Sequence, residues 1–492
     1  MDGPSTGETP LTQSLSRALA ALALALPLRS AMALQAEPAR PPNIVVFVAD
    51  DLGWRDSEPY GNRAIRTPSI ARLARDGLLV RYAFGTSPQC SPSRISMLSG
   101  RFSHATRTED LHTPLPDGVA LLPTLLRKAG YFTGDMAKTH YGPNGERQFQ
   151  WYSPETAPAL PGFLDSAGTR PFFLWVGFHE PHRPYDSTVK RVHLPAGVAL
   201  TPYLTDTPGT REDVARYYDA TARMDGKIGE MMAELGRRKL LDRTLIVFLS
   251  DNGAPFPREK GTLYDSGTRT PLILVWPGVI RPGSVWDRGQ LSTIDLAPTL
   301  LDLAGLTPPT DLQGRSFRDL LTAPETFAGD AYTFSERNWH DCDEHQRAVR
   351  TMRYKLIRTD AYTDLPLCTP ADIGASASFL ALRARAKAGR LSAAQRRLFE
   401  APRARLELYD LQADPWELKN IADEPAQAAR VRELARVLQA WMEDTDDFPA
   451  AYRVRDDNTD RVTGVPFTSK IPPLRNAELP PASERWGTQG PT

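Results

Sequence analysis

The sequence predicts an α/β protein with a large, doubly wound mixed sheet, followed by a smaller C-terminal α+β domain. Nearly continuous apolar runs at 43–49, 171–178 and 245–249 alternate with helical segments. A strand that is apolar on both faces is typical of a parallel sheet covered by helices. The composition changes near residue 330, after which strand-like segments precede one amphipathic helix. That order predicts an antiparallel sheet covered by one helix.

Helical patterns separate the predicted strands. A helix begins at Thr67-Pro68 and ends before Gly77, because proline fits the first helical turn and glycine often follows the last. The other elements expected before residue 330 are a helix at 121–129, a strand at 131–136 and a long helix at 211–235.

The second domain is expected to contain strands at 348–358 and 406–411, with a helix at 392–399 that Ser392 caps. An amphipathic helix at 426–442 would cover this sheet. We place the domain boundaries as follows: signal peptide 1–36, catalytic domain 37–330, C-terminal subdomain 331–455 and irregular tail 456–492.

Length and charge limit the function. The 492 residues suffice for a large core and a second domain. Lys+Arg and Asp+Glu both number 59, so the formal net charge is zero. Without a basic excess or a basic run, nucleic acid or an anionic membrane is not expected as the main partner. An anionic substrate would have to be held by local charge in a pocket.

The N-terminus resembles a signal peptide. Arg17 precedes an apolar run at 18–28, and the Ala-Met-Ala at 31–33 resembles a signal-peptidase site. The run is too short to span a membrane. We therefore expect a secreted or periplasmic protein, with a frayed Ala/Leu-rich helix as the alternative.

The segment from Cys90 to Gly100 predicts a short helix with a reactive sulfur at its start. Ser91 is a good N-cap, Pro92 fits the first helical position, and Gly100 can end the helix in a left-handed conformation. Cys90 would lie at the positive end of the helix dipole, with Arg94 one turn away. This arrangement suggests a nucleophile beside an anion site. The alternative is an ordinary buried cysteine.

Polar side chains follow four predicted strands, at the edge where ligands bind in open α/β sheets. Adjacent carboxylates repel each other unless a cation neutralises them, and aspartate and asparagine oxygens suit calcium. In an extended chain Lys138 and His140 would point to the same side. Taken singly, each cluster is also compatible with a solvated or capped loop. The four clusters are Asp50 with Asp51, Lys138 with His140, His182, and Asp251 with Asn252.

The chain contains three cysteines. In an exported protein Cys342 and Cys368 can pair, which leaves Cys90 as the odd one. The sequence leaves this pairing open, because it does not show geometry. An unpaired thiol in an oxidising compartment is a liability unless it is used or modified, which supports a modified Cys90.

Taken together, these motifs resemble those of the type I sulfatases, in the alkaline phosphatase superfamily. The resemblance covers residues 43–445 and implies an alkaline phosphatase-like fold and a sulfuric ester hydrolase. It implies one Ca²⁺ per chain and conversion of Cys90 to formylglycine (3-oxoalanine) by a formylglycine-generating or other sulfatase-maturing enzyme. By resemblance, the calcium ligands are Asp50, Asp51, Asp251 and Asn252. The matching motifs are Asp50-Asp51, Cys90-x-Pro92-Ser93-Arg94, Lys138-x-His140, His182, Asp251-Asn252-Gly253 and Lys260-Gly261-Thr262.

The resemblance also implies roles for the cationic residues. Formylglycine, as its hydrate, is the nucleophile, and Arg94 steadies that hydrate and the metal site. Lys138, His182 and Lys260 bind sulfate oxygens, and His140 assists the release of sulfate from the covalent intermediate. These roles agree with the chemistry, because sulfate transfer needs positive charge against three oxygens. One hydroxyl of the hydrate attacks sulfur, and the other can expel sulfate.

Three stretches, at 178–183, 251–257 and 407–415, are similar to the sulfamidase (N-sulfoglucosamine sulfohydrolase) branch of the family. This similarity implies action on heparin or heparan sulfate fragments, in glycosaminoglycan degradation. The animal enzymes carry arginine where this chain has Lys260, so the preference between N-sulfate and O-sulfate stays open. The alternatives are a carbohydrate O-sulfatase of other specificity, a phosphoester or phosphonate hydrolase, and an inactive carbohydrate-binding protein.

Further polar residues are expected to contact the sugar, some beside the histidine cluster and others in the second domain. For the second-domain residues the alternative is a solvated loop tied by Cys342. The sequence leaves the oligomeric state open, a homodimer included. The expected sugar contacts are His179, Arg183, Glu336, His340, Asp343 and His345.

Overall fold

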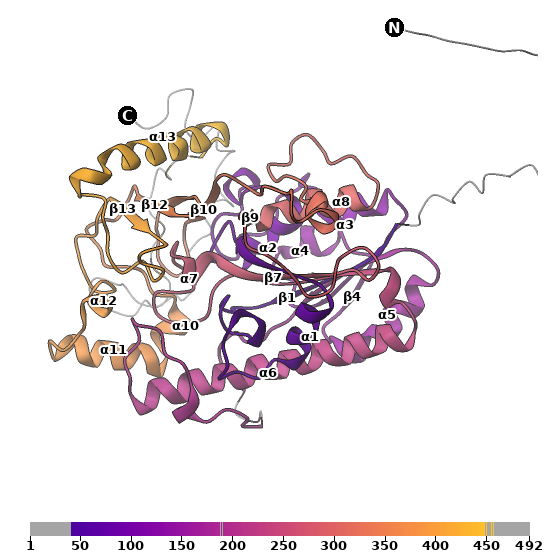
Figure 1. Cartoon of the computed structure of the whole chain (residues 1–492), viewed down its shortest axis with the longest axis horizontal. Coiled ribbons are helices and arrows are strands. Elements are labelled where there is room, and N and C mark those ends of the chain that lie inside the picture. Colours follow the sequence, from indigo (N-terminus) through magenta and orange to yellow (C-terminus); the bar gives the residue numbers. More distant parts are fainter. Residues whose placement is uncertain are drawn as a thin grey trace, which may run out of the picture. The chain divides into compact units, whose positions relative to one another are not determined.

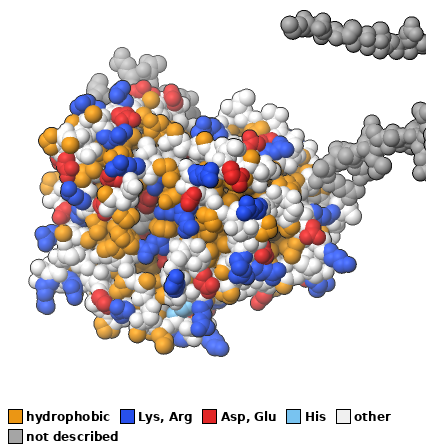
Figure 2. Space-filling view, viewed as in Figure 1, with side chains coloured by type: hydrophobic (Ala, Val, Ile, Leu, Met, Phe, Trp, Pro, Cys, Tyr) orange, Lys and Arg blue, Asp and Glu red, His pale blue; other side chains and the backbone are white. Residues whose placement is uncertain are grey.

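The computed structural model describes residues 41–186, 188, 190–447, 449, 454 and 456. The predicted signal peptide lies outside this part of the chain, as does the predicted tail apart from Asp456. Among the described helices, none combines the length and the apolar character needed to cross a membrane. Figure 2 shows basic and acidic side chains interspersed over one face of the molecule.

The large sheet has nine strands in the order β4-β3-β5-β1-β6-β7-β2-β8, with β9 beside β2. Strands β3, β5, β1 and β6 are parallel neighbours, and β7 runs antiparallel to both β6 and β2. The predicted mixed sheet is therefore confirmed. The strands are β1 (Asn43–Ala49), β2 (Leu78–Phe84), β3 (Phe132–Ala137), β4 (Trp151–Ser153), β5 (Phe172–Gly177), β6 (Thr244–Ser250), β7 (Arg269–Val275), β8 (Ser284–Trp286) and β9 (Leu291–Ser292).

Helices cover both faces of this sheet, as Figure 1 shows. Val45 and Phe47 of β1 belong to a core that includes α1 (Pro68–Asp76), α5 (Leu160–Ala167) and α6 (Pro208–Arg237). The alternate residues of β1 belong to a second core on the opposite face. That core includes the helices α2 (Cys90–Ser99), α3 (Leu122–Arg127) and α8 (Leu296–Leu303).

Helix α6 begins three residues before the predicted start at 211. Thr207 caps the helix, because its side chain accepts a hydrogen bond from the backbone N–H of Thr210 at 3.2 Å. Pro208 occupies the first helical position. The predicted cap at Ser392 is confirmed, since its side chain accepts from the backbone of Gln395 at 3.3 Å.

A second, antiparallel sheet has the order β10-β11-β12-β13. The strands are β10 (Thr333–Arg337), β11 (Gln346–Arg350), β12 (Tyr354–Thr359) and β13 (Leu406–Asp410). Helix α13 (Ala428–Asp444) covers the sheet, because Leu434 and Leu438 pack in one core with Leu356 of β12. The predicted small antiparallel sheet with one helix is confirmed, whereas the domain boundaries stay predictions.

The single strand predicted at 348–358 is wrong. Two strands, β11 and β12, pair here as a hairpin. Thr351 turns the chain, donating its N–H to the carbonyl of Tyr354 at 2.8 Å while its hydroxyl accepts the N–H of Tyr354 at 2.9 Å. The turn contains no glycine or proline, so no residue type in this stretch marks the break between the two strands.

The remaining helices are short and connect these layers. They are α4 (Gly142–Glu146), α7 (Asp265–Thr268), α9 (Arg318–Thr322), α10 (Ala371–Gly374), α11 (Ala377–Lys387) and α12 (Ala393–Arg396). Short 3-10 turns lie at Glu58–Tyr60, His104–Thr106, Ala157–Ala159, Pro195–Gly197, Leu241–Arg243, Thr293–Asp295 and Pro425–Gln427.

Candidate active site

The carboxyl ends of β3, β5, β1 and β6 meet at one edge of the sheet, because these strands are parallel neighbours. Backbone hydrogen bonds continue beyond the strands: Lys138 N–H donates to the carbonyl of Gly177 at 2.7 Å, and Asp251 N–H to that of Ala49 at 3.1 Å. The loops that follow the strands are thereby held together. The polar clusters predicted at four strand ends all lie at this edge.

Carboxylates from two of these loops meet at the centre. Asp50, Asp51, Cys90 and His182 each place one potential ligand atom within 4.8 Å of the others. The backbone N–H of Asp51 donates to Asp251 Oδ1 at 3.1 Å. The positive φ of Asp51, 69°, is a conformation that aspartate tolerates better than most residues, and it turns the chain back toward Asp251.

Each carboxylate has a cationic partner. Lys138 Nζ bonds to Asp50, Lys260 Nζ lies 2.8 Å from Asp51 Oδ2, and Arg94 Nε lies 2.8 Å from Asp251 Oδ2. Burial raises the pKa of Asp50, but nearby Lys138, His182 and Arg94 outweigh it and hold that pKa well below the ordinary value. Asp50 is therefore ionised at neutral pH.

Helix α2 carries Cys90 into this cluster. Its thiol Sγ lies 3.4 Å from Asp50 Oδ1 and 3.8 Å from Asp51 Oδ1. Burial raises the pKa of the Cys90 thiol well above its ordinary value, despite nearby Lys138 and Lys260. Because the thiolate is the nucleophilic form of cysteine, an unmodified Cys90 would be a weak nucleophile here.

The predicted N-cap of α2 is wrong. The helix begins at Cys90, one residue before the predicted cap, and Gln89 holds the cap position. The hydroxyl of Ser91 instead accepts a hydrogen bond from the backbone N–H of His112 at 2.8 Å. The predicted left-handed end is confirmed, with a φ of 67° at Gly100.

The extended conformation expected for Lys138 and His140 is also wrong. Ala137 and His140 have φ values of 60° and 69°, so the chain turns between them. Lys138 points to Asp50, whereas the His140 ring lies beside the His112 ring, with 4.7 Å between their centroids. Burial and the charge of Lys138 hold the pKa of His140 well below its ordinary value.

These residues open onto a cavity of about 490 Å³. His112, Lys138, His140 and His179 line it. Of the predicted sugar contacts, His179 therefore lies beside the lysine and histidine assigned to catalysis. No motif marked His112, which lies in a loop after α2 and was missed in the sequence.

Four of the predicted sugar contacts are engaged elsewhere. Arg183 makes a fork to Asp213 at 2.6 and 2.9 Å, and Glu336 accepts from the backbone and hydroxyl of Ser103 at 2.8 and 2.6 Å. These contacts anchor loops rather than face the cavity. Similarly, Asp343 accepts from Tyr362 and Val454, and His345 lies between Asp360 and Asp447.

The predicted contact His340 is buried, and its Nδ1 lies 3.0 Å from Asp341 Oδ2. A disulfide joins the neighbouring Cys342 to Cys368. The pairing that the sequence left open is therefore present, and Cys90 is the free cysteine.

Asp372 also lies at this site, although no sequence pattern points to it. This residue begins no motif and follows no strand, yet its Oδ2 lies 3.3 Å from Lys260 Nζ and 3.9 Å from His182 Nε2. It reaches the site on the short helix α10, after the disulfide.

The side chains of Asp50, Asp51, Asp251 and Asn252 are chemically suited to a calcium ion. Three carboxylates and one amide converge, and oxygen ligands of this kind suit calcium. The side-chain oxygen of Asn252 is buried without a hydrogen-bond partner, while its nitrogen donates to Asp51 Oδ1 at 2.8 Å. A buried carbonyl oxygen without a donor is what a bound cation would satisfy.

The comparisons with known proteins agree with this geometry. The sulfatase family model matches residues 42–306, more than half of the chain. The chain belongs to the sulfatase family. It is accordingly a sulfuric ester hydrolase. The model for the C-terminal part of N-sulphoglucosamine sulphohydrolase matches residues 258–365.

This sulfatase is 32% identical to human N-sulphoglucosamine sulphohydrolase over 463 residues, which cover 83% of the chain and 91% of the relative. It is 28% identical to an ulvan-active sulfatase of Formosa agariphila over 461 residues, covering 82% and 74%. It shares its fold with the solved phosphonate monoester hydrolase of Silicibacter pomeroyi (TM-score 0.62, 20% identity, covering 82% and 96%).

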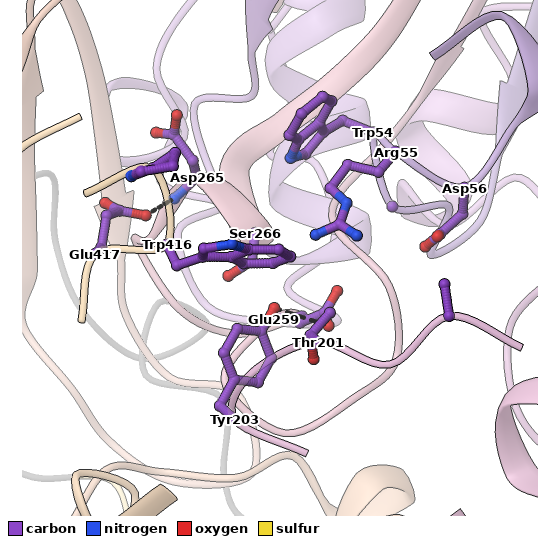
Figure 3. Close-up of a pocket in the computed structure, with 13 residues that line it drawn as sticks. Trp54, Arg55, Asp56, Thr201, Tyr203, Glu259, Asp265, Ser266, Trp416 and Glu417 are labelled. Carbon is purple, nitrogen blue, oxygen red and sulfur yellow. Dashed lines mark hydrogen bonds between the residues drawn. The ribbon is translucent and has the colours of Figure 1, made fainter. Parts of the chain in front are cut away.

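A second cavity, of about 270 Å³, is lined by residues 53–56, which follow β1, and by residues 415–417 (Figure 3). The guanidinium of Arg55 lies over the Trp416 ring, 4.1 Å from its centroid, and Glu259 accepts a hydrogen bond from Tyr203 at 2.9 Å. None of the predicted site residues lines this cavity. Burial and neighbouring Asp56 raise the pKa of Glu259 to about 8.

This raised pKa predicts a pH-dependent stability. The folded protein keeps the proton of Glu259 up to a pH of about 8, whereas the unfolded chain loses it near the ordinary value of 4.5. The stabilisation is complete below about pH 4.5 and is lost as the pH rises through about 8. Urea unfolding at about pH 5 and about pH 9 should show wild type losing a few kcal/mol more than Glu259→Gln. An equal loss of unfolding free energy in wild type and Glu259→Gln would contradict the raised pKa of Glu259.

Proposed function

We propose that this sulfatase releases the sulfate group of a sulfated sugar, and that its substrate is N-sulfoglucosamine in heparin or heparan sulfate fragments. Identity of 32% over most of human N-sulphoglucosamine sulphohydrolase supports this substrate, as does the match to the C-terminal family model. The apolar N-terminal segment supports export of the protein to the periplasm or the cell exterior.

One observation carries the proposal: Cys90 lies buried at the start of α2 with its Sγ 3.4 Å from Asp50 Oδ1 and with Lys138, Lys260 and Arg94 close by. Burial also raises the pKa of the Cys90 thiol, and since a protonated thiol is a poor nucleophile, this favours a modified attacking group at the position. Converted to formylglycine, Cys90 supplies a hydrate hydroxyl as the nucleophile.

Calcium would be held by Asp50, Asp51, Asp251 and Asn252, whose side chains meet at the sheet edge. When bound, it supplies positive charge to the reacting sulfate group. The buried amide oxygen of Asn252 that lacks a partner supports this assignment.

The chain's own cations then bind the substrate. Lys138, Lys260 and His182 lie beside Asp50 and Asp51, and we assign their donors to the sulfate oxygens. Charge held in a fixed, buried site stabilises a transition state more than mobile charge in water does.

Arg94 and His140 have other proposed roles: Arg94 positions two loops, and His140 accepts a proton. Arg94 donates to Asp251 at 2.8 Å and to the carbonyl of Lys138 at 3.2 Å, so it fixes two loops relative to the helix that carries Cys90. His140 is neutral at pH 7 because its pKa is lowered, so its ring nitrogen can accept a proton during release of sulfate.

A phosphonate ester hydrolase is the second candidate, favoured by the fold shared with the enzyme of Silicibacter pomeroyi. Turnover of N-sulfoglucosamine, of sugars sulfated at other positions and of a phosphonate monoester separates these functions. Release of sulfate from the N-position supports our proposal. Faster turnover of the phosphonate would contradict it, and release of O-sulfate alone would keep the class but change the substrate.

Replacing the nucleophile tests the mechanism. Cys90→Ala should lower kcat by about 1,000-fold or more, because no attacking group remains. The conservative Met97→Leu in the same helix is a matched control, expected to keep activity since its volume is conserved. Mass spectrometry of residue 90 in wild-type protein checks the modification. An unmodified thiol in fully active protein would contradict the proposal.

Metal removal tests the calcium site. Dialysis against a chelator should lower activity, and calcium should restore it. Calcium at about 100 times its Kd should also raise Tm, since binding adds about 2.7 kcal/mol to the free energy of unfolding. In Asp251→Ala this rise should be much smaller, because a ligand is missing. An equal rise in both proteins would place the ion elsewhere.

A further inference from the structure

A carboxylate lies among the cations that the proposed function assigns to sulfate. Asp372 Oδ2 is 3.3 Å from Lys260 Nζ and 3.9 Å from His182 Nε2. A sulfate oxygen placed against this carboxylate would be repelled, because both carry negative charge. Asp372 is therefore unsuited to bind sulfate itself.

The backbone fixes the direction of this carboxylate. Its Oδ1 accepts the N–H of Ile373 at 2.9 Å, which leaves Oδ2 toward Lys260. The preceding N–H, of Ala371, donates to Asp341 Oδ2 at 2.7 Å. Asp372 is thus held at the start of α10 by contacts on both sides.

The segment around Asp372 also packs against the loop of Lys260. A Cβ on Gly261 would lie 3.0 Å from Cγ of Pro370, so the two chains are in close contact. The disulfide from Cys368 to Cys342 ties the same segment to the second sheet. These contacts make the position of Asp372 part of the fold rather than of a loose loop.

The two members of the Asp372–Lys260 pair differ in solvent exposure. The Lys260 side chain is 2% exposed, whereas that of Asp372 is 24% exposed. The carboxylate therefore lies on the open side of the site. A substrate whose sulfate rests against Lys260 would bring the atoms next to that sulfate toward Asp372.

We propose that Asp372 is a specificity-determining residue that accepts a hydrogen bond from the substrate's donor group beside the sulfate. In N-sulfoglucosamine the donor is the sulfamate N–H or the hydroxyl on the adjacent carbon. An ionised carboxylate only accepts hydrogen bonds, so it distinguishes substrates with such a donor from those without one. The inference rests on the proposed function, because it takes Lys260 and His182 as the sulfate-binding groups.

The test compares two substrates in the full-length protein. N-sulfoglucosamine has the donor, and p-nitrophenyl sulfate lacks one beside its sulfate. Asp372→Ala should lower kcat/KM for the sugar by about 10- to 100-fold, the usual effect of losing a hydrogen bond to a charged group. For the aryl sulfate kcat/KM should stay within about threefold or rise, because a negative charge near the sulfate is removed.

Asp372→Asn refines the result, because its amide oxygen still accepts a hydrogen bond without the charge. Its kcat/KM for the sugar should lie between those of wild type and Asp372→Ala. Asp364→Ala is a matched control, since Asp364 is an exposed aspartate on the same segment. It should leave both substrates unchanged. Should Asp372→Ala fold poorly, Asp372→Asn decides the test alone.

Two results would overturn the inference: equal losses on both substrates, which indicate a structural role, or no loss on the sugar. A failure of the proposed substrate is distinguishable from these. In that case wild type releases sulfate only from an O-sulfated sugar, whose adjacent hydroxyl is the donor. The loss of kcat/KM in Asp372→Ala is then compared between that sugar and p-nitrophenyl sulfate. A selective loss there supports the role of Asp372, and an unselective one refutes it.

Discussion

Pairing of buried opposite charges is the interaction on which this site depends. Asp50, Asp51 and Asp251 are nearly inaccessible to solvent, and each contacts a lysine or an arginine. A buried ionic group costs several kcal/mol unless it is paired. The partners come from different loops, so satisfying the charges also fixes the loops in place. The same charges give the site its chemistry, because the lysines that balance the carboxylates are those proposed to bind sulfate.

The large sheet brings the paired charges close to one another. Four adjacent parallel strands end at one edge, and each supplies a short loop with charged or polar side chains. A residue from further along the chain joins this site. Helix α10 follows β12 of the antiparallel sheet and brings Asp372 against Lys260. The groups proposed to act in catalysis thus lie at the edge of the large sheet, whereas the group proposed to choose the substrate comes from a later segment of the chain.

Much of this arrangement was predictable from the sequence. Apolar runs marked β1, β5 and β6, and parallel pairing then required their polar ends to converge. The details that failed depend on backbone conformation or on distant contacts. The positive φ values of Ala137 and His140, which replace the extended conformation expected there, have no glycine or asparagine to signal them.

The assignment of sugar contacts was the least predictable part. Polar residues in a loop look alike in sequence whether they face a substrate or another carboxylate. Arg183 and Glu336 turned out to be anchored by Asp213 and Ser103. Asp372 showed no pattern at all, because its partners are remote in the chain and only folding brings them together.

The contact between Gly261 and Pro370 has a consequence for how this enzyme can change. Gly261 has a φ of 78°, a conformation that side chains rarely adopt, and a methyl group there would lie 3.0 Å from Cγ of Pro370, so the proline ring would have to move by a few tenths of an ångström. A larger residue at either position would separate the two loops. Because Lys260 and Asp372 lie one and two residues from these positions, such a change would also alter the distance between the lysine and the carboxylate.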